Sequence, residues 1–271
     1  MVRLSNRRER NRSLPALWIA ACAAPFVWAL SAAADEPIDL DLYGRLLQEH
    51  TREVSGTVGT VVDYRALKAS PEWTRLVAQL ETAKPSRASR DERLAFWINA
   101  YNILTIDLIL KHYPIDGIKD IGSFFSPVWN VDVATIEGRT ISLGEIEHDV
   151  LRKMDEPRIH GAIVCASISC PPLSRTPFRA ARIDADLTTA MRRWLLNREK
   201  GVTVDRDRET VFLSKIFDWF EEDFESRGGV LASITPFLDA SDAEWIRAQG
   251  ASARIRYFPY DWSLNDAKRF E

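Results

Sequence analysis

Cysteine and histidine are scarce in this chain of 271 residues, which has three cysteines and four histidines. Their spacing matches none of the common zinc patterns. The sequence also lacks a glycine-rich phosphate loop, a glycine-flanked serine and a dinucleotide fingerprint, which argues against P-loop, α/β-hydrolase and Rossmann enzymes. Basic residues are scattered and nearly balanced by acidic ones, so we expect no nucleic-acid partner.

Long apolar runs occur only twice, and the first lies near the N-terminus. Five arginines are followed by an apolar stretch from Leu14 to Leu30 and by small residues up to Ala34, an order typical of a secretory signal peptide. A lipoprotein site at Cys22 and a twin-arginine signal at Arg7 and Arg8 are weaker alternatives. The sequence therefore predicts a signal peptide at 1–34, one globular domain at 35–271, and a periplasmic or secreted protein.

The second apolar run, from Leu94 to Leu110, predicts a central buried helix because it has no glycine or proline and is apolar on almost every side. It is short for a membrane span and contains two asparagines and an aspartate, so we expect no transmembrane helix in the mature protein. Asn99 and Asn102 lie three residues apart on one side of this helix. A buried carboxamide needs hydrogen-bond partners, so polar groups must face these two residues.

The remaining pattern mixes helices with short strands. A capping box at Ser142 predicts a helix to about Lys153, and residues 158–165 read as a buried strand that ends in a loop of small residues closed by two prolines. Hairpins are predicted from 128–136 with 139–142 and from 202–205 with 210–213. Together these elements predict the α+β class, as a helix-rich single domain with a small, mostly antiparallel sheet around a central buried helix.

Several short blocks resemble a known family. They are Phe96–Asn102, Ser142–Arg152, Arg158–His160, Cys165–Pro171, Leu213–Lys215 and Tyr260–Trp262. In this order they resemble the domain of unknown function 547 family, whose core corresponds to residues of about 90–225. The resemblance implies no established activity, although bacterial members often follow an export signal. It does imply that these blocks meet in one place.

Cys165 and Cys170 are the two cysteines that remain after the predicted cleavage. A small disulfide is one interpretation, since exported proteins fold in an oxidising compartment. The other is a thiolate nucleophile, with Cys170 better placed than Cys165 because the loop leaves a buried strand. A redox pair would prefer two intervening residues to four, so oxidoreductase chemistry is less favoured by the spacing.

His148 and His160 are the histidines predicted to lie near these cysteines. Each could simply be a buried neutral side chain with one hydrogen bond. Together with Glu147, Asn99 and the two cysteines they form a richer set than a core needs, and a thiol with an imidazole base and an orienting Asn or Glu is the general form of Cys-dependent acyl transfer. A zinc site built from the two histidines and two cysteines is a weaker alternative.

Substrate contacts are predicted from the same blocks. The candidate residues are Asn102, Arg152, Arg158, Lys215 and Asp261. The basic ones could hold an anionic group, although ion pairs with Glu147 or Asp261 are a plainer explanation. The aromatic residues Phe217, Trp219, Phe220 and Trp262 read as core more readily than as a carbohydrate platform.

The leading functional hypothesis is an exported Cys-dependent hydrolase or acyl transferase acting on an amide or ester, without a cofactor or metal. The alternative is a non-catalytic periplasmic domain that binds a peptide or glycan and has a structural cysteine pair. In either case the expected ligand is a small molecule, a peptide or a glycan.

Overall fold

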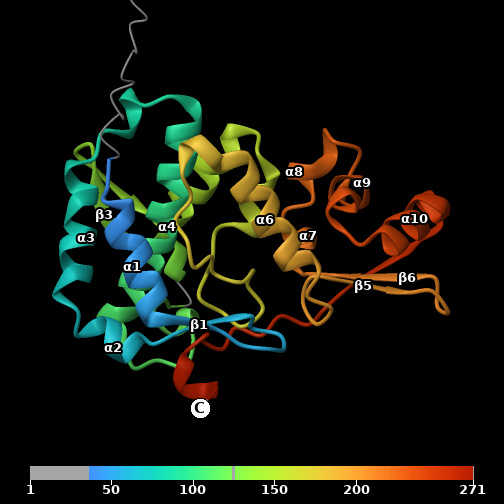
Figure 1. The fold of residues 1–271 in the computed structure, drawn as a ribbon, viewed down its shortest axis with the longest axis horizontal. Coiled ribbons are helices and arrows are strands. Elements are labelled where there is room, and N and C mark those ends of the chain that lie inside the picture. Colours follow the sequence, from blue (N-terminus) through green and yellow to red (C-terminus); the bar gives the residue numbers. More distant parts are fainter. Residues whose placement is uncertain (1–36, 124–125, 271) are drawn as a thin grey trace, which may run out of the picture. The chain divides into compact units, whose positions relative to one another are not determined.

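The protein is a helix-rich α+β domain, as the sequence predicts. The computed structural model describes residues 37–123 and 126–270, so the predicted signal peptide at 1–34 lies outside the described residues. The helices and short helical turns are interspersed with three small sheets of two or three strands (Figure 1). They enclose two large hydrophobic cores, and a third, small cluster lies around Val58, Val61 and Ala267.

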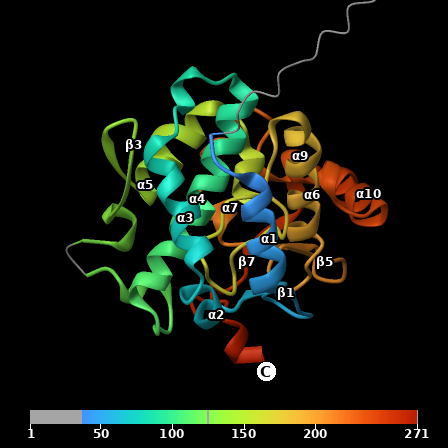
Figure 2. The ribbon, with the colours of Figure 1, turned by 60° about the vertical axis from the view of Figure 1, so that its left-hand side comes forward.

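Helix α4 (Arg90–His112) is the predicted central helix and the longest one in the described chain. Ser89 begins it with a capping box to Glu92, and residues 94–106 are all buried. Helices α2 (Tyr64–Lys68), α3 (Pro71–Thr82) and α6 (Ile183–Leu195) pack against it, and α1 (Leu40–His50) packs on α2 and α3 (Figure 2). Although α4 is long and apolar enough for a membrane span, nearly all of it is buried inside the protein.

The sheets are short and mostly antiparallel. The strand bounds are β1 Thr51–Glu53, β2 Thr60–Val62, β3 Asp132–Ile136, β4 Arg139–Ser142, β5 Val202–Asp205, β6 Thr210–Leu213 and β7 Arg254–Tyr257. β1 pairs with β2, β3 with β4, and β5 with β6, all antiparallel, whereas β6 and β7 are parallel. The second predicted hairpin has the expected bounds, and the first begins later because residues 128–130 form a 3₁₀ turn.

The predicted buried strand at 158–165 is wrong. Residues Pro157–Gly161 form a 3₁₀ helix, and irregular chain leads from there to Cys165. Pro157 begins the turn, and Gly161 packs so closely on Met191 that an added Cβ would lie 2.7 Å from the sulfur. The apolar run correctly predicts that these residues are buried, but burial alone does not distinguish a strand from a packed turn.

The helix predicted from Ser142 is present but is not a regular α-helix. It begins as α5 (Leu143–Glu145), continues as a π-helix at Ile146–Leu151 and ends as a 3₁₀ turn at Arg152–Met154. The N–H of Arg152 donates to the carbonyl of Glu147, five residues earlier. A π-segment of this kind is frequent at functional sites, and Glu147 and His148 both lie within it.

The C-terminal third of the chain forms the second core. It combines α6, the three-stranded sheet and the helices α7 (Ile216–Trp219), α8 (Glu222–Glu225), α9 (Val230–Ile234) and α10 (Ala240–Gln249). Beyond β7 the chain returns to the first core, where Ser263 bridges to Gly117, Leu264 to Ser167 and Asp266 to Val62. In both ribbon views the C-terminal turn accordingly lies beside β1 (Figures 1 and 2).

Candidate functional site

A cleft of about 130 Å³ brings together five of the six residues that were predicted to be catalytic. Its lining consists of Tyr101, Trp129, Glu147, His148, His160, Ile163, Cys165, Cys170, Ile216, Trp219, Phe220, Tyr260 and Trp262. Both predicted histidines, both cysteines and Glu147 are among them. The rest of the lining is almost entirely aromatic or aliphatic, so the polar groups face a largely apolar space.

Asn102 directs the chain into the cysteine loop. Its carboxamide donates to the carbonyl of Ala162 at 3.0 Å and accepts from the N–H of Val164 at 2.9 Å. Both bonds are buried, so the irregular chain before Cys165 has its backbone groups satisfied by a side chain of α4. Asn102 therefore positions the loop and does not line the cleft.

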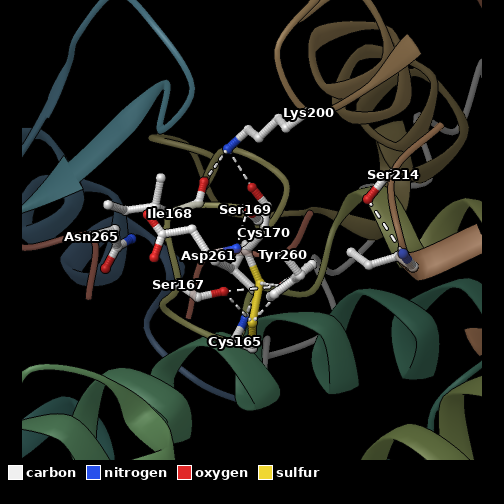
Figure 3. The surroundings of a disulfide bond; sticks show 12 residues. Cys165, Ser167, Ile168, Ser169, Cys170, Lys200, Ser214, Tyr260, Asp261 and Asn265 are labelled. Carbon is white, nitrogen blue, oxygen red and sulfur yellow. Dashed lines mark hydrogen bonds between the residues drawn. A yellow bond between two sulfur atoms is a disulfide. The ribbon is translucent and has the colours of Figure 1, made fainter. Parts of the chain in front are cut away.

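Cys165 and Cys170 are joined by a disulfide (Figure 3), which is one of the two interpretations left open by the sequence. Cys170 is buried, with 3% of its surface exposed, whereas Cys165 is only partly buried. The Cys170 sulfur accepts a hydrogen bond from the backbone N–H of Cys165 at 2.9 Å. The two sulfurs thus differ both in access and in the donors around them.

The Tyr260 hydroxyl lies between the two sulfurs, 3.3 Å from that of Cys170 and 3.2 Å from that of Cys165. Ser167 donates to the same hydroxyl at 3.1 Å, which leaves the phenolic proton directed towards the disulfide. Burial raises the pKa of Tyr260 well above its usual value, so the group stays a protonated donor. The Cys170 sulfur therefore has two N–H or O–H donors.

Lys200 holds the loop from the side opposite α4. Its ammonium donates to the carbonyls of Val58 at 2.8 Å and Ile168 at 3.0 Å, and also to that of Cys170 (Figure 3). Burial, with a contribution from Arg193, lowers the pKa of this lysine to about 7. The three carbonyls tie the cysteine loop to the β1–β2 hairpin.

The C-terminal segment forms the third support of the loop. Ile168 donates to the carbonyl of Ser263 at 2.8 Å, and Asn265 donates to that of Ala166 at 2.9 Å. The backbone N–H of Asp261 donates to the Ser169 hydroxyl at 2.9 Å, while its carboxylate accepts from Ser263. Asp261, predicted to bind substrate, therefore holds backbone and lies outside the cleft lining.

His160 forms the inner end of a buried charged network. Its Nε2 lies 2.7 Å from Asp223 Oδ2, and Arg152 holds the same carboxylate through two bonds of 2.7 Å. Burial lowers the pKa of His160, although Asp223 opposes that shift, so the ring is neutral with its proton on Nε2. The other nitrogen, Nδ1, is left unprotonated, as a general base requires.

His148 is held by the outer side of the same arginine. Arg152 donates to His148 Nδ1 at 3.0 Å, and because a guanidinium only donates, Nδ1 is the acceptor and Nε2 carries the proton. Partial burial, reinforced by Arg152, lowers the pKa of His148. Arg152 thus contacts His148 directly and His160 through Asp223, while its predicted role in substrate binding stays a prediction.

Glu147 is a carboxyl group that faces an apolar cleft. It accepts a hydrogen bond from the Tyr101 hydroxyl at 3.3 Å, and Tyr101 is itself buried on α4. Burial raises the pKa of Glu147 to about 7, more than the Tyr101 bond and the nearby Arg152 lower it. A carboxyl with such a pKa can both accept and donate a proton near neutral pH.

One wall of the cleft is aromatic. The rings of Trp219, Tyr260 and Trp262 lie within 4.5–5.5 Å of one another, and Trp129 lies 6.4 Å from Trp262. Trp219 is 42% exposed. Of the four aromatics interpreted as core, Phe217 is buried against Trp194, whereas Trp219, Phe220 and Trp262 line the cleft.

Three further predicted site residues lie elsewhere. Asn99 exchanges two hydrogen bonds with the backbone of Phe178, so it holds a different loop. Arg158 pairs with Glu156 and Asp184, and Lys215 pairs with Asp218. Ion pairing, the plainer explanation of these basic residues, therefore describes them, although their partners are not the acids proposed from the sequence.

Two residues of the site escaped the sequence reasoning. Asp223 lies in an acidic run at 221–223 that reads as a solvated surface, and nothing in its spacing points to His160. Tyr260 belongs to the Tyr260–Trp262 block that resembles the family, but only its long-range contact with the disulfide shows its role. No group of three or more His, Cys, Asp or Glu side chains suited to a metal ion occurs in residues 37–123 and 126–270.

Residues 85–195 match the model of a family described as "Protein of unknown function, DUF547". This match supports the resemblance drawn from the sequence blocks. No curated protein and no solved structure matches the chain. The matched segment contains the disulfide, Glu147 and both cleft histidines, whereas Asp223, Trp219, Tyr260 and Trp262 lie outside it.

Proposed function

We propose that the cleft carries out thiol–disulfide exchange through Cys165 and Cys170. The observation that carries the proposal is the asymmetry of the two sulfurs. Both cysteines line the cleft, but Cys165 is partly accessible, while the buried Cys170 sulfur accepts from the Cys165 N–H. The Tyr260 hydroxyl lies within 3.3 Å of both sulfurs, and the Cys165 sulfur is also 3.0 Å from the Ser167 hydroxyl. Donors at a departing sulfur stabilise its thiolate, and a more stable thiolate leaves faster.

The step balances without a cofactor. A substrate thiolate attacks Cys165 Sγ, the Cys165–Cys170 bond breaks, and Cys170 leaves as a thiolate while a mixed disulfide forms at Cys165. A second thiolate then attacks the substrate sulfur of the mixed disulfide and releases Cys165. Two substrate thiols are oxidised to one disulfide, and the protein is reduced to a dithiol. The reverse sequence reduces a substrate disulfide.

Glu147 is suited to the accompanying proton transfer. It lines the same cleft, and its pKa of about 7 lets it take the proton of an incoming thiol and return one to a departing thiolate. The spacing of four residues between the cysteines differs from that of common redox pairs. In this loop the hydrogen-bond donors beside Cys170 stabilise its thiolate, as the surroundings of a pair with two intervening residues do in common redox motifs.

Acyl transfer by the reduced protein is the second candidate. The His160–Asp223 pair supports it, because a neutral imidazole oriented by a carboxylate is the base of a Cys-dependent hydrolase or transferase. This function requires a free thiolate, whereas exchange begins from the disulfide itself. A non-catalytic peptide- or glycan-binding domain, with the disulfide purely structural, is the remaining alternative. A periplasmic or secreted location agrees with each of the three.

Native-state reduction and trapping test the proposal. The full chain with Cys22→Ser, which leaves one pair of thiols, is equilibrated with reduced and oxidised dithiothreitol, and thiols are counted by alkylation and mass spectrometry. We expect reversible reduction of the folded protein. The reduced Cys170→Ser variant should trap a mixed disulfide with 2-hydroxyethyl disulfide at Cys165, and reduced Cys165→Ser should trap far less because Cys170 is buried.

Each outcome selects one function. A pair that resists reduction until urea unfolds the protein would overturn exchange and leave the binding domain. Reduction without mixed-disulfide formation, together with an acyl burst from p-nitrophenyl acetate that His160→Ala removes, would favour acyl transfer instead. Circular dichroism of each variant shows whether it is folded.

A further inference from the structure

Glu147 lines the cleft and forms no ion pair with a basic side chain of the described chain, a feature that it shares with the buried Asp266, which binds the Tyr113 hydroxyl. Asp223 binds Arg152, Glu156 binds Arg158, and Asp242 binds Arg198 and Arg206. Glu147 instead accepts a hydrogen bond from the neutral hydroxyl of Tyr101. Arg152 is close enough to lower the pKa of Glu147, but its guanidinium group is hydrogen-bonded to Asp223, Glu222 and His148.

An ionised carboxylate in an apolar cleft is costly unless a cation lies beside it. Within residues 37–123 and 126–270 no basic side chain forms an ion pair with Glu147. The cleft itself is open to a ligand and contains this carboxyl. A positively charged ligand group would therefore supply the missing partner.

The aromatic wall adds a second feature that favours a cation. Aromatic faces attract ammonium groups within about 6 Å, most strongly in a desolvated site. The ammonium of Lys119 already lies 4.6 Å from the centre of the Trp262 ring, so this ring does accept a cation. The rings of Trp219 and Tyr260 pack beside Trp262, and all three line the cleft with Glu147.

The partly exposed Cys165 lies in this same cleft. From these contacts we infer that the preferred substrate is a small thiol or disulfide that carries an ammonium group, with the ammonium against Glu147 and the aromatic rings and the sulfur against Cys165. A space of about 130 Å³ limits the buried part to a few non-hydrogen atoms. Because it names a substrate class for the exchange reaction, this inference rests on the proposed function.

The test compares three thiols of similar size and different charge: cysteamine, 2-mercaptoethanol and 3-mercaptopropionate. Second-order rate constants are measured for reduction of the protein disulfide at pH 8, in the full chain with Cys22→Ser. Each constant is divided by that of the same thiol with 2-hydroxyethyl disulfide, which removes differences in thiol pKa and nucleophilicity. We expect about a tenfold preference for cysteamine over 2-mercaptoethanol, with the anionic thiol slowest.

Two variants show whether the preference for a cationic thiol arises at Glu147 or from the overall charge of the protein. Glu147→Gln should reduce the preference for cysteamine to within about twofold of 2-mercaptoethanol, since it removes the charge and retains the shape. Asp149→Asn is the matched control, because Asp149 is an exposed acid two residues away on the same helical segment and pairs with Lys153. It removes the same unit of charge and should retain the preference.

The possible failures are distinguishable. Equal normalised rates for the three thiols in the wild type would overturn the inference and leave the exchange proposal intact. An unchanged preference in Glu147→Gln, or one lost equally in Asp149→Asn, would also overturn it, since the discrimination would not arise at Glu147. If no thiol reduces the folded protein, the proposed function itself fails. Melting curves confirm that both variants are folded.

Discussion

The two walls of the cleft differ in chemistry and in origin. The disulfide, Glu147 and His160 come from residues within the 85–195 family match. Asn102 of α4 and the buried Lys200, which lies just beyond the match, fix the backbone around the cysteines. The aromatic wall of Trp219, Tyr260 and Trp262 comes from the C-terminal third of the chain. The two walls therefore come from different parts of the chain, and a substitution can be placed in either one.

The largest effect is expected at the sulfur wall. Cys165→Ser removes the more accessible of the two cysteine sulfurs that line the cleft, so exchange should fall to the background rate with every thiol, whatever its charge. The loss is measured as the rate of mixed-disulfide formation with 2-hydroxyethyl disulfide. The aromatic wall remains intact in this variant, so binding of cysteamine, followed by calorimetry, should persist. Exchange retained at the wild-type rate would show that Cys165 is not the attacked sulfur.

Asp223 joins the two walls, because it belongs to the C-terminal third and binds His160 and Arg152 of the matched segment. Asp223→Asn should lower the free energy of unfolding by about 3 kcal/mol, since it leaves a largely buried guanidinium without its main partner. Urea unfolding followed by circular dichroism measures this change. Asp218→Asn, at a more exposed ion pair with Lys215, is the control and should change stability by about 0.5 kcal/mol or less.

Asn102 tests whether the sulfur wall depends on α4. Asn102→Leu should cost about 2 kcal/mol, because it leaves the buried carbonyl of Ala162 and the N–H of Val164 without partners. The measurement is the urea midpoint beside that of Asn130→Leu, where the asparagine is exposed. Equal midpoints for the two variants would contradict the role given to this carboxamide.

The sequence predicts the central helix well because its signal is local. A long apolar run without glycine or proline favours a buried helix, and its two asparagines do find backbone partners. The error at 158–165 has the opposite cause, since a short apolar run is equally compatible with a strand and with a packed turn. The π-segment at 146–151 is likewise invisible, because it arises from packing and not from residue preference.

The site could be predicted only in part for a related reason. Cys165, Cys170, His148, His160 and Glu147 were found because reactive residue types are rare and lie close together along the chain. Asp223 and the aromatic wall lie about 50 residues or more further on, and their contacts depend on how the C-terminal segment returns to the first core. A single sequence does not show which distant segments will come into contact, so these residues could not be assigned to the site.

Glu147 gives the smallest predicted effect. It lies in the sulfur wall and faces the aromatic wall, so its substitution tests both walls together. Its pKa is about 7 in the folded protein and about 4.5 as its ordinary value. The folded state therefore binds the proton more tightly, and the stability due to the protonated form is complete below pH 4.5 and lost as the pH rises through 7. Allowing for partial exposure, the loss between pH 4 and pH 8 should be about 1.5 kcal/mol.

Glu147→Gln should abolish this pH-dependent part, because the amide does not ionise. Unfolding free energies of the wild type and the variant are measured at pH 4 and pH 8, and the difference of differences isolates Glu147 from the other titrating groups. The variant should become the more stable of the two as the pH rises. Cysteamine at saturating concentration should reverse part of that advantage at pH 8, since an ammonium beside the ionised carboxylate stabilises the wild type alone. A pH dependence identical in both proteins would mean that Glu147 is ionised and solvated, and that the cleft has no carboxylate in need of a cation.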